Sequence, residues 1–304
     1  MLAQKTDAPK AKAGAAAAAP AKPAKKGPPI PLLTIEGVGG GAITPMAYMC
    51  NTGPAGTIVG KPAVAYTFLN LGSKTLHTVS ITQTFLRRIE LGYAYNFFNI
   101  ATLPTDINKA TGINAGRNDL HLNHFNLRVM LIEEDSFDLP LPAITAGIHF
   151  KHNEGIKKID DRLVGTLTRM AYDRHYGVDY TITATKMLPK LAFGRPVVLT
   201  GGMRISRAAQ IGLLGFGEST AVTFEGSAAC LPTDWLLLAY EIRTKDNPFN
   251  STNSLIGREQ NWHAFSATWL VNEHLSVSAI YGLLGTVANA NADNTIGVQV
   301  KYEF

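Results

Sequence analysis

The chain ends in the stretch NTIGVQVKYEF, which runs from Asn294 to Phe304. Every second residue is apolar or aromatic: Ile296, Val298, Val300, Tyr302 and Phe304. The residues between them are small or polar: Thr295, Gly297, Gln299, Lys301 and Glu303. Because a β-strand points successive side chains to opposite faces, this pattern predicts a strand with one apolar face and one polar face.

The position of this strand at the end of the chain adds to its meaning. A terminal Phe, two residues after a Tyr, resembles the closing strand of a bacterial outer-membrane β-barrel. The resemblance implies that this strand is an assembly signal for the barrel-assembly machinery. The alternative is a half-buried strand of a soluble β-sandwich.

Eleven earlier segments have the length of strands, and many alternate in the same way. They are Pro62–Leu71, Leu76–Phe85, Ile89–Phe98, Leu120–Ile132, Ala143–His152, Tyr176–Met187, Val197–Arg207, Thr220–Ala229, Trp235–Lys245, Trp262–Val271 and Leu275–Thr286. With the closing strand they number about twelve, an even number as in single-chain barrels. The predicted fold is all-β, a transmembrane antiparallel up-and-down barrel over residues 30–304.

The lengths of the links between these strands support a barrel. The longest links, 99–119, 153–175 and 246–261, all fall at one end, and the short links 86–88 and 272–274 fall at the other. Outer-membrane barrels have long loops outside and short periplasmic turns. The apolar spacing in 156–164 also predicts a short amphipathic helix in one long loop.

The basic excess of the chain is local. Lys and Arg number 28 against 23 acidic residues, but residues 1–29 alone hold six lysines and one aspartate. The Ala, Lys and Pro composition of 1–29 predicts a disordered periplasmic tail. The tail is either a spacer or a contact for acidic cell-wall polymer or lipid head groups. The neutral remainder carries no basic stripe and indicates no nucleic-acid partner.

The sequence contains no sign of a cofactor or of a helical membrane anchor. Cys50 and Cys230 form neither a disulfide framework nor a metal-ligand spacing, so no metal or cofactor is expected. No run of 18 apolar residues exists, whereas barrel strands need only about ten alternating residues. No signal-peptide core follows Met1, so we expect the sequence as given to lack the leader that export requires.

Residues 31–51 precede the first predicted strand and are rich in glycine. The absence of Gly-Lys-Ser/Thr argues against a phosphate-binding loop. One hypothesis is that this segment, with Glu36, Gly39, Gly40 and Gly41, folds into the lumen as a partial plug. The alternative is a first hairpin around Gly39–Gly41, which would make about fourteen strands.

The inward face is where function is expected. Its predicted pore-lining ionisable residues are Glu90, Arg128, Lys151, Asp179, Arg204, Glu225, Glu241, Arg243 and Lys245. A wall with both charges could select solutes by sign and size. The sequence therefore favours a passive channel for small polar or amphipathic solutes, with a closed structural or interaction barrel as the alternative.

Catalysis is not expected. His124 and His149 fall on the inward face and His263 on a strand, but no serine occupies a matching outward position. A lipid-modifying barrel enzyme is therefore the least favoured alternative. Outer-membrane lipid is the expected partner, met by an aromatic girdle near the strand ends. The predicted girdle residues are Tyr93, Phe97, Trp235, Trp262, Trp269, Tyr302 and Phe304.

Six motifs carry a wider resemblance. They are IEGVGGG at 35–41, LPAITAG at 141–147, DYTITATK at 179–186, AQIGLLGFG at 209–217, FEGSA at 224–228 and YEIRTK at 240–245. In these motifs the chain resembles an uncharacterised family of predicted outer-membrane barrels, known as domain of unknown function 3034. The resemblance covers residues 33–304 and implies the fold and an outer-membrane location, but no activity.

Overall fold

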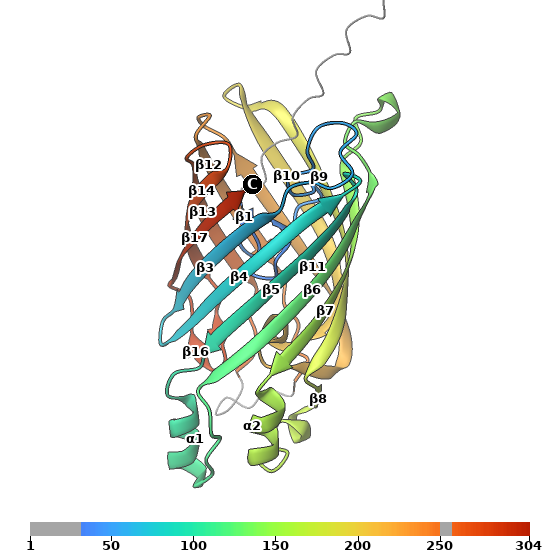
Figure 1. The fold of residues 1–304 in the computed structure, drawn as a ribbon. Helices are drawn as coiled ribbons and strands as arrows, with labels where there is room; N and C mark the ends of the chain where they lie inside the picture. The colour runs from blue at the N-terminus through green and yellow to red at the C-terminus, as the bar shows by residue number, and fades with distance from the viewer. Residues whose placement is uncertain (1–31, 250–256) are drawn as a thin grey trace, which may run out of the picture.

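A computed structural model describes residues 32–249 and 257–304, and twelve of its strands form one closed antiparallel barrel (Figure 1). In chain order the barrel strands are β3 (Ala63–Leu71), β4 (Lys74–Phe85), β5 (Ile89–Asn99), β6 (Asp119–Ile132), β7 (Ala143–Glu154), β9 (Tyr176–Ala192), β10 (Arg195–Ala208), β11 (Phe216–Cys230), β12 (Leu236–Arg243), β13 (Trp262–Leu270), β14 (Leu275–Leu283) and β17 (Thr295–Glu303). The last strand closes the circle on the first, with Val300 of β17 opposite Tyr66 of β3. The predicted twelve-stranded barrel is confirmed.

The strand count rules out the predicted alternative of fourteen strands. β1 (Leu32–Leu33) and β2 (Gly39–Gly40) pair with each other in a separate two-stranded sheet. The tail at residues 1–29 lies outside the described residues.

The barrel exposes its apolar side chains and buries its polar ones. On β17, Ile296 is 64 % exposed, whereas Gln299 and Lys301 are 1 % and 2 % exposed. β6 repeats this pattern, with Phe125 exposed and Arg128 buried. A soluble sandwich would bury the apolar set instead, so that alternative is wrong.

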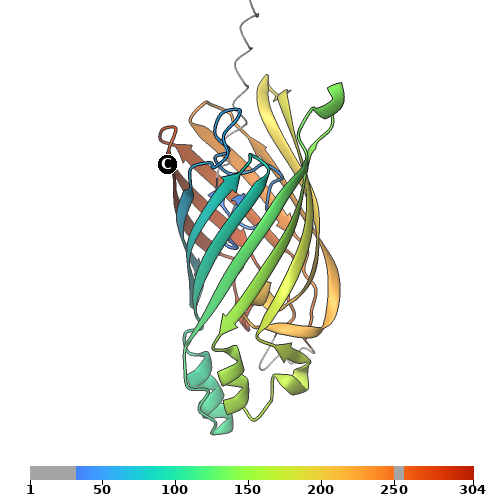
Figure 2. The same cartoon turned by 45° about the vertical axis from the view of Figure 1, so that its right-hand side comes forward.

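The two ends of the barrel differ (Figures 1 and 2). The end opposite the C-terminus, called the helical end, carries α1 (Leu103–Thr111) and α2 (Ile156–Arg162). The predicted helix in 156–164 is therefore confirmed. The links 99–119 and 153–175 lie at this end as expected, and so do the described parts of 246–261, which are 246–249 and 257–261. Smaller elements complete the helical end: η2 (Thr168–Met170), β8 (Tyr172–Arg174), η3 (Ala209–Gly212), β15 (Thr286–Val287) and β16 (Ala290–Asn291).

The C-terminal end carries the short links 86–88 and 272–274, as well as η1 (Ser136–Asp138) between β6 and β7. In the described part of the chain, no helix is long and apolar enough to cross a membrane. The twelve barrel strands are 8 to 17 residues long, with β12 the shortest and β9 the longest.

Candidate functional site

Residues 32–51, called the inner segment, lie inside the barrel (Figure 1). All of them are buried except Tyr48 and Asn51, which are half-buried. A tight turn connects β1 to β2, with the Thr34 amide donating to the Val38 carbonyl at 2.8 Å. Gly37 occupies this turn at φ +80°, and a Cβ there would lie 2.7 Å from the Cβ of Ala94. Only glycine fits this position.

Side chains from the wall hydrogen-bond the backbone of the inner segment. Thr145 donates to the Ala47 carbonyl at 2.6 Å, and Thr185 accepts the Ala47 amide at 2.8 Å. Arg128 donates to the carbonyls of Met46 and Tyr48 at 2.5 and 3.0 Å. Further contacts come from Thr82, Thr84, Glu90, Asn126, Glu241 and Gln299. The wall thus satisfies backbone groups that a sheet would otherwise pair.

Glu241 of β12 holds one bend of the inner segment. Its carboxylate accepts the amides of Ala42, Ile43 and Thr44 at 2.7, 2.9 and 2.8 Å, and the Thr44 hydroxyl at 2.7 Å. A Cβ on Gly41 would lie 2.3 Å from Cδ of Glu241. Four hydrogen bonds offset much of the cost of burying this carboxylate.

Six charged side chains form a buried cluster, called the ion cluster. It consists of Glu36, Lys151, Asp179, Arg204, Glu225 and Arg243. Glu36 is the only member from the inner segment, and its carboxylate contacts all three cations, Arg243 at 2.6 Å and Arg204 at 3.0 Å among them. Every member's side chain is 4 % exposed or less.

The ion cluster is electrically balanced, with three carboxylates and three cations. Asp179 pairs with Lys151 at 2.6 Å and Arg204 at 2.9 Å, and Glu225 pairs with Arg204 at 2.6 Å. Removing one partner of a buried ion pair leaves an uncompensated charge, which costs about 3–5 kcal/mol. The cluster therefore holds the Glu36 carboxylate at one place in the barrel, because moving it away would leave the three cations with only two carboxylates.

A second segment enters the barrel from the helical end. Residues 209–215, called the inward loop, join β10 to β11, and 209–214 are buried. Lys151 donates to the Ile211 carbonyl at 3.1 Å, and Asn153 donates to the carbonyls of Gly212 and Leu213 at 2.8 Å. Ile211 is held at φ +60°, which is strained for a β-branched residue. Lys151 thus connects the inner segment, through Glu36, to the inward loop.

Lys74 of β4 is buried near the helical end, but many of the inward side chains there are apolar. They belong to one buried cluster that includes Leu69, Leu76, Phe98, Leu120, Leu122, Trp262 and Ile280. Ile35 and Ile43 of the inner segment join the same cluster. The lumen is therefore polar in its middle and largely apolar toward the helical end.

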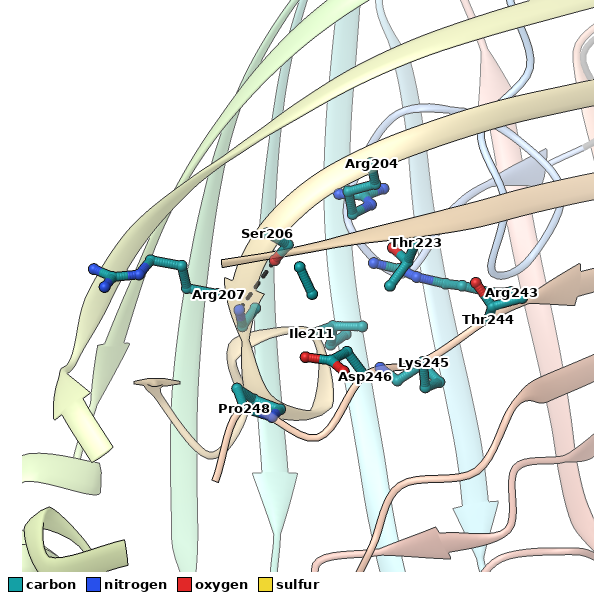
Figure 3. A pocket seen from close by; sticks show the side chains of 12 residues that line it. Arg204, Ser206, Arg207, Ile211, Thr223, Arg243, Thr244, Lys245, Asp246 and Pro248 are labelled. Atoms are coloured by element: carbon teal, nitrogen blue, oxygen red, sulfur yellow. Dashed lines mark hydrogen bonds between the residues drawn. The ribbon is translucent and has the colours of Figure 1, made fainter. Parts of the chain in front are cut away.

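A polar recess reaches the ion cluster through the wall (Figure 3). β11 and β12 pair from Cys230 and Leu238 as far as Glu225 and Arg243, and Thr244 still bonds Phe224 beyond that pair. Farther along, Pro248 lies against Gly217 at the start of β11. A Cβ on Gly217 would lie only 2.5 Å from the Pro248 carbonyl oxygen. The recess is lined by Arg204, Ser206, Arg207, Thr223, Arg243, Thr244, Lys245 and Asp246, among others. Figure 3 shows Arg204 and Arg243 on its inner side and Arg207 directed away.

The structure places eight of the nine predicted pore-lining residues inside the barrel, buried and in contact with one another or with the inner segment. Glu90 pairs with Arg128 at 2.8 Å, separately from the ion cluster. Lys245 is the exception: it lies outside the barrel strands, because β12 ends at Arg243. Its Nζ lies 2.9 Å from Glu259, and burial lowers the pKa of Lys245 below its ordinary value. That these residues line an open pore stays a prediction.

The girdle prediction is wrong for Trp262. This residue begins β13 on the inward face and is 2 % exposed, with Lys245 Nζ 4.1 Å from its ring centre. Trp235, Trp269, Tyr302 and Phe304 are exposed at the C-terminal end of the barrel. Tyr93 and Phe97 are half-buried among outward rings, Tyr93 beside Phe125 and Phe97 beside His121. Contact of these six with a lipid interface stays a prediction.

The histidines have polar partners within the wall. His149 bonds Asn126 and Thr181, each at 2.8 Å. His124 lies 3.3 Å from Asn96, and His263 bonds Tyr240 at 2.8 Å. Within residues 32–249 and 257–304, no group of His, Cys, Asp and Glu is arranged to hold a metal ion.

Sequence reasoning missed the uncharged residues that hold the inner segment. Thr82, Asn126, Thr145, Thr185 and Gln299 all occupy alternate inward positions. The alternating pattern of each strand does place these polar residues on the inward face. It does not reveal that their polar groups bind the backbone of another segment rather than water.

These features define the class as a transmembrane β-barrel with the inner segment inside it. The chain belongs to the family described as "Protein of unknown function (DUF3034)", which matches residues 31–301. The family resemblance expected from the motifs is confirmed.

Several solved structures are similar to the chain. The NanC porin has a TM-score of 0.47 at 7 % identity, covering 80 % of this chain and 98 % of its own. The outer membrane protein Omp33 of Acinetobacter baumannii has 0.44 at 10 %, covering 81 % and 99 %. An outer membrane channel from Pseudomonas putida F1 has 0.43 at 11 %, covering 81 % and 94 %. Among curated proteins, none matches this sequence.

Proposed function

We propose that this protein is an outer-membrane channel for small polar or amphipathic solutes, closed by the inner segment and the inward loop. One observation carries the proposal: the wall holds residues 44–51 mainly through polar side chains. Thr145, Thr185 and Arg128 all bind backbone groups of this stretch. Each bond from a threonine contributes only about 0.5–1.5 kcal/mol and each bond from the charged Arg128 about 1.5–3 kcal/mol, because water can replace them. Residues 44–51, held in this way, can leave the lumen while exposing few apolar side chains, Met46, Met49 and Cys50 among them.

The apolar outer surface supports a location in the outer membrane. Exposed Val79, Ile81, Phe125, Ile148 and Val300 lie on the outward faces of their strands. In this proposal they face lipid, and the helical end faces outward because it carries the long loops. The C-terminal strand serves the barrel-assembly machinery, and the basic tail contacts acidic cell-wall polymer.

A closed structural barrel is the second candidate. The balance of the ion cluster favours it, because a fully paired buried network holds the inner segment in one position. We propose no enzymatic activity, since the buried histidines bond Asn and Thr side chains rather than a serine nucleophile.

Single-channel conductance in a planar bilayer separates the two candidates. The full chain is expected to be mostly closed, and deletion of residues 32–51 is expected to give steady ohmic steps. Deletion of residues 1–29 is the matched control and should behave as the full chain. Heat-dependent mobility on a detergent gel verifies that each barrel is folded. Silence of the folded 32–51 deletion would overturn the channel and favour the structural barrel.

A further inference from the structure

An apolar pocket lies at the helical end, apart from the ion cluster. Four separate parts of the chain line it: the α1 region, α2 with its following turn, the inward loop and the link before β17. The lining residues are all apolar: Ile100, Leu103, Pro104, Ile107, Ala115, Leu120, Ile156, Ile159, Leu163, Leu167, Leu214 and Ala288. The pocket opens to solvent, and the centre of a water-sized sphere can occupy about 40 Å³ of it.

Polar contacts behind the pocket hold its shape. Asp160 is 5 % exposed and accepts the Leu167 amide at 2.7 Å and the Thr168 hydroxyl at 2.6 Å. These bonds fix the turn after α2, so that Leu163 and Leu167 both line the pocket. A site whose lining is fixed in advance loses little entropy when a ligand binds.

The residues around the pocket favour one class of ligand. The outer faces of both helices carry exposed charged residues, Asp106 and Lys109 on α1 and Lys157 and Asp161 on α2. A protein surface docking there would meet these charges before the apolar lining. Both helices also project beyond the strands (Figure 2), away from the outward apolar belt that lipid would cover. An uncharged small molecule fits the lining, because no polar side chain is present to orient a charged one.

We infer that this pocket binds an uncharged hydrophobic molecule with about one aromatic ring or a short alkyl chain, between α1 and α2. The binding itself stands on the pocket alone. A role in uptake rests on the proposed channel, and it follows from Leu214, which belongs to the inward loop. Nine of the twelve lining residues also belong to the same buried cluster as Ile35 and Ile43 of the inner segment. A bound solute would therefore touch the loop that closes the lumen.

Photolabelling of the full chain in lipid nanodiscs tests this inference. The probe is uncharged trifluoromethyl-phenyl-diazirine, toluene is the competitor, and labelled peptides are read by mass spectrometry. Labelling of the 100–120 and 155–167 peptides should saturate and fall severalfold with toluene. Labelling of lipid-facing Phe125 or Val300 should rise linearly and resist competition. Labels confined to the outward belt, or pocket labels that toluene does not reduce, would overturn the inference.

A matched pair of variants adds a second readout. Ala115→Trp places an indole in the pocket and should abolish the saturable labels, whereas Lys157→Trp adds the same group to the exposed face of α2 and should leave them unchanged. If Ala115→Trp loses its heat-dependent mobility, Leu163→Trp replaces it. Equal labelling of the filled variant and its control would count against the pocket. If labelling is saturable but the folded 32–51 deletion shows no conductance, the pocket is supported and the proposed channel is overturned. If that deletion conducts but the labelling does not saturate, the channel is supported and the pocket is overturned.

Discussion

Gln299, on the strand that closes the barrel, binds Leu33 at the start of the inner segment through both ends of its amide group. The Leu33 amide donates to Oε1 at 3.0 Å, and Nε2 donates to the Leu33 carbonyl at 2.7 Å. Nε2 also donates to Thr67 of the neighbouring strand at 2.6 Å. One side chain thus mimics the pairing that a β-strand would give to Leu33, and it joins the two ends of the described chain.

The Gln299→Leu variant should loosen the inner segment. Leaving buried backbone groups unpaired costs about 1–3 kcal/mol, so the open population should rise by about 5- to 150-fold. The native thiol of Cys50, which is fully buried, reports this opening through its reaction with a water-soluble maleimide. The measurement uses a Cys230→Ser background. Gln83→Leu is the control, because Gln83 bonds Gly60 outside the inner segment. An unchanged Cys50 rate in Gln299→Leu would contradict the prediction.

The Glu36→Gln variant should destabilise the ion cluster by leaving Lys151, Arg204 and Arg243 with one negative charge too few. The expected loss is about 3–5 kcal/mol of inner-segment docking, seen as faster Cys50 labelling and more frequent conductance steps. Adding Lys151→Met to Glu36→Gln restores neutrality and should recover part of the loss. If the fold-change in Cys50 labelling of the double variant equals the product of the fold-changes of Glu36→Gln and Lys151→Met alone, the charges do not interact.

The Gly41→Ala variant should displace the Glu241 carboxylate, because the new Cβ would lie 2.3 Å from its Cδ. Three amides of the inner segment would then lose their acceptor, and Cys50 labelling should accelerate by about tenfold or more. Gly201→Ala is the matched control, since a Cβ there meets nothing within 4 Å. Similar labelling rates for the two alanine variants would argue that the Glu241 contact does not hold the segment.

The Phe125→Arg variant tests the lipid-facing surface. Phe125 is 50 % exposed in the middle of β6, and an arginine on the lipid face near the bilayer centre costs about 2–4 kcal/mol. Val164→Arg, at an exposed site after α2, should be neutral. The free energy of unfolding from vesicles in urea measures both. Equal stabilities would mean that β6 does not face lipid.

The Phe304→Ala variant separates assembly in the cell from folding in the test tube. Phe304 is half exposed, and its amide donates to the Pro62 carbonyl at 3.1 Å, a bond that alanine keeps. Refolding into detergent should therefore be unchanged, while the amount of heat-modifiable barrel in outer membranes should fall severalfold. Normal amounts in cells would contradict an assembly signal at the terminal aromatic residue.

Among the described residues, the sequence predicted which charged side chains point into the barrel, but not which residues they contact there. Eight of the nine charged candidates were recognised from strand alternation alone, because side-chain direction in a strand repeats every two residues. Glu36 and Arg243 lie 207 positions apart, and no local pattern shows that they meet. Lys245 and Trp262 were misplaced for a related reason. β12 ends two residues early, so Lys245 leaves the strand and lies over the ring of Trp262, which starts the next strand.

The sequence by itself determined the barrel: its twelve strands, the end that carries the long links and the polarity of each face. These are local properties, since a period of two and the length of a link can be read from neighbouring residues. Only the tertiary structure decided that residues 32–51 occupy the lumen, that Lys151 connects them to the inward loop, and that α1 and α2 enclose an apolar pocket. Those outcomes depend on the register with which distant strands close into one circle, and that register brings together side chains that the chain keeps far apart.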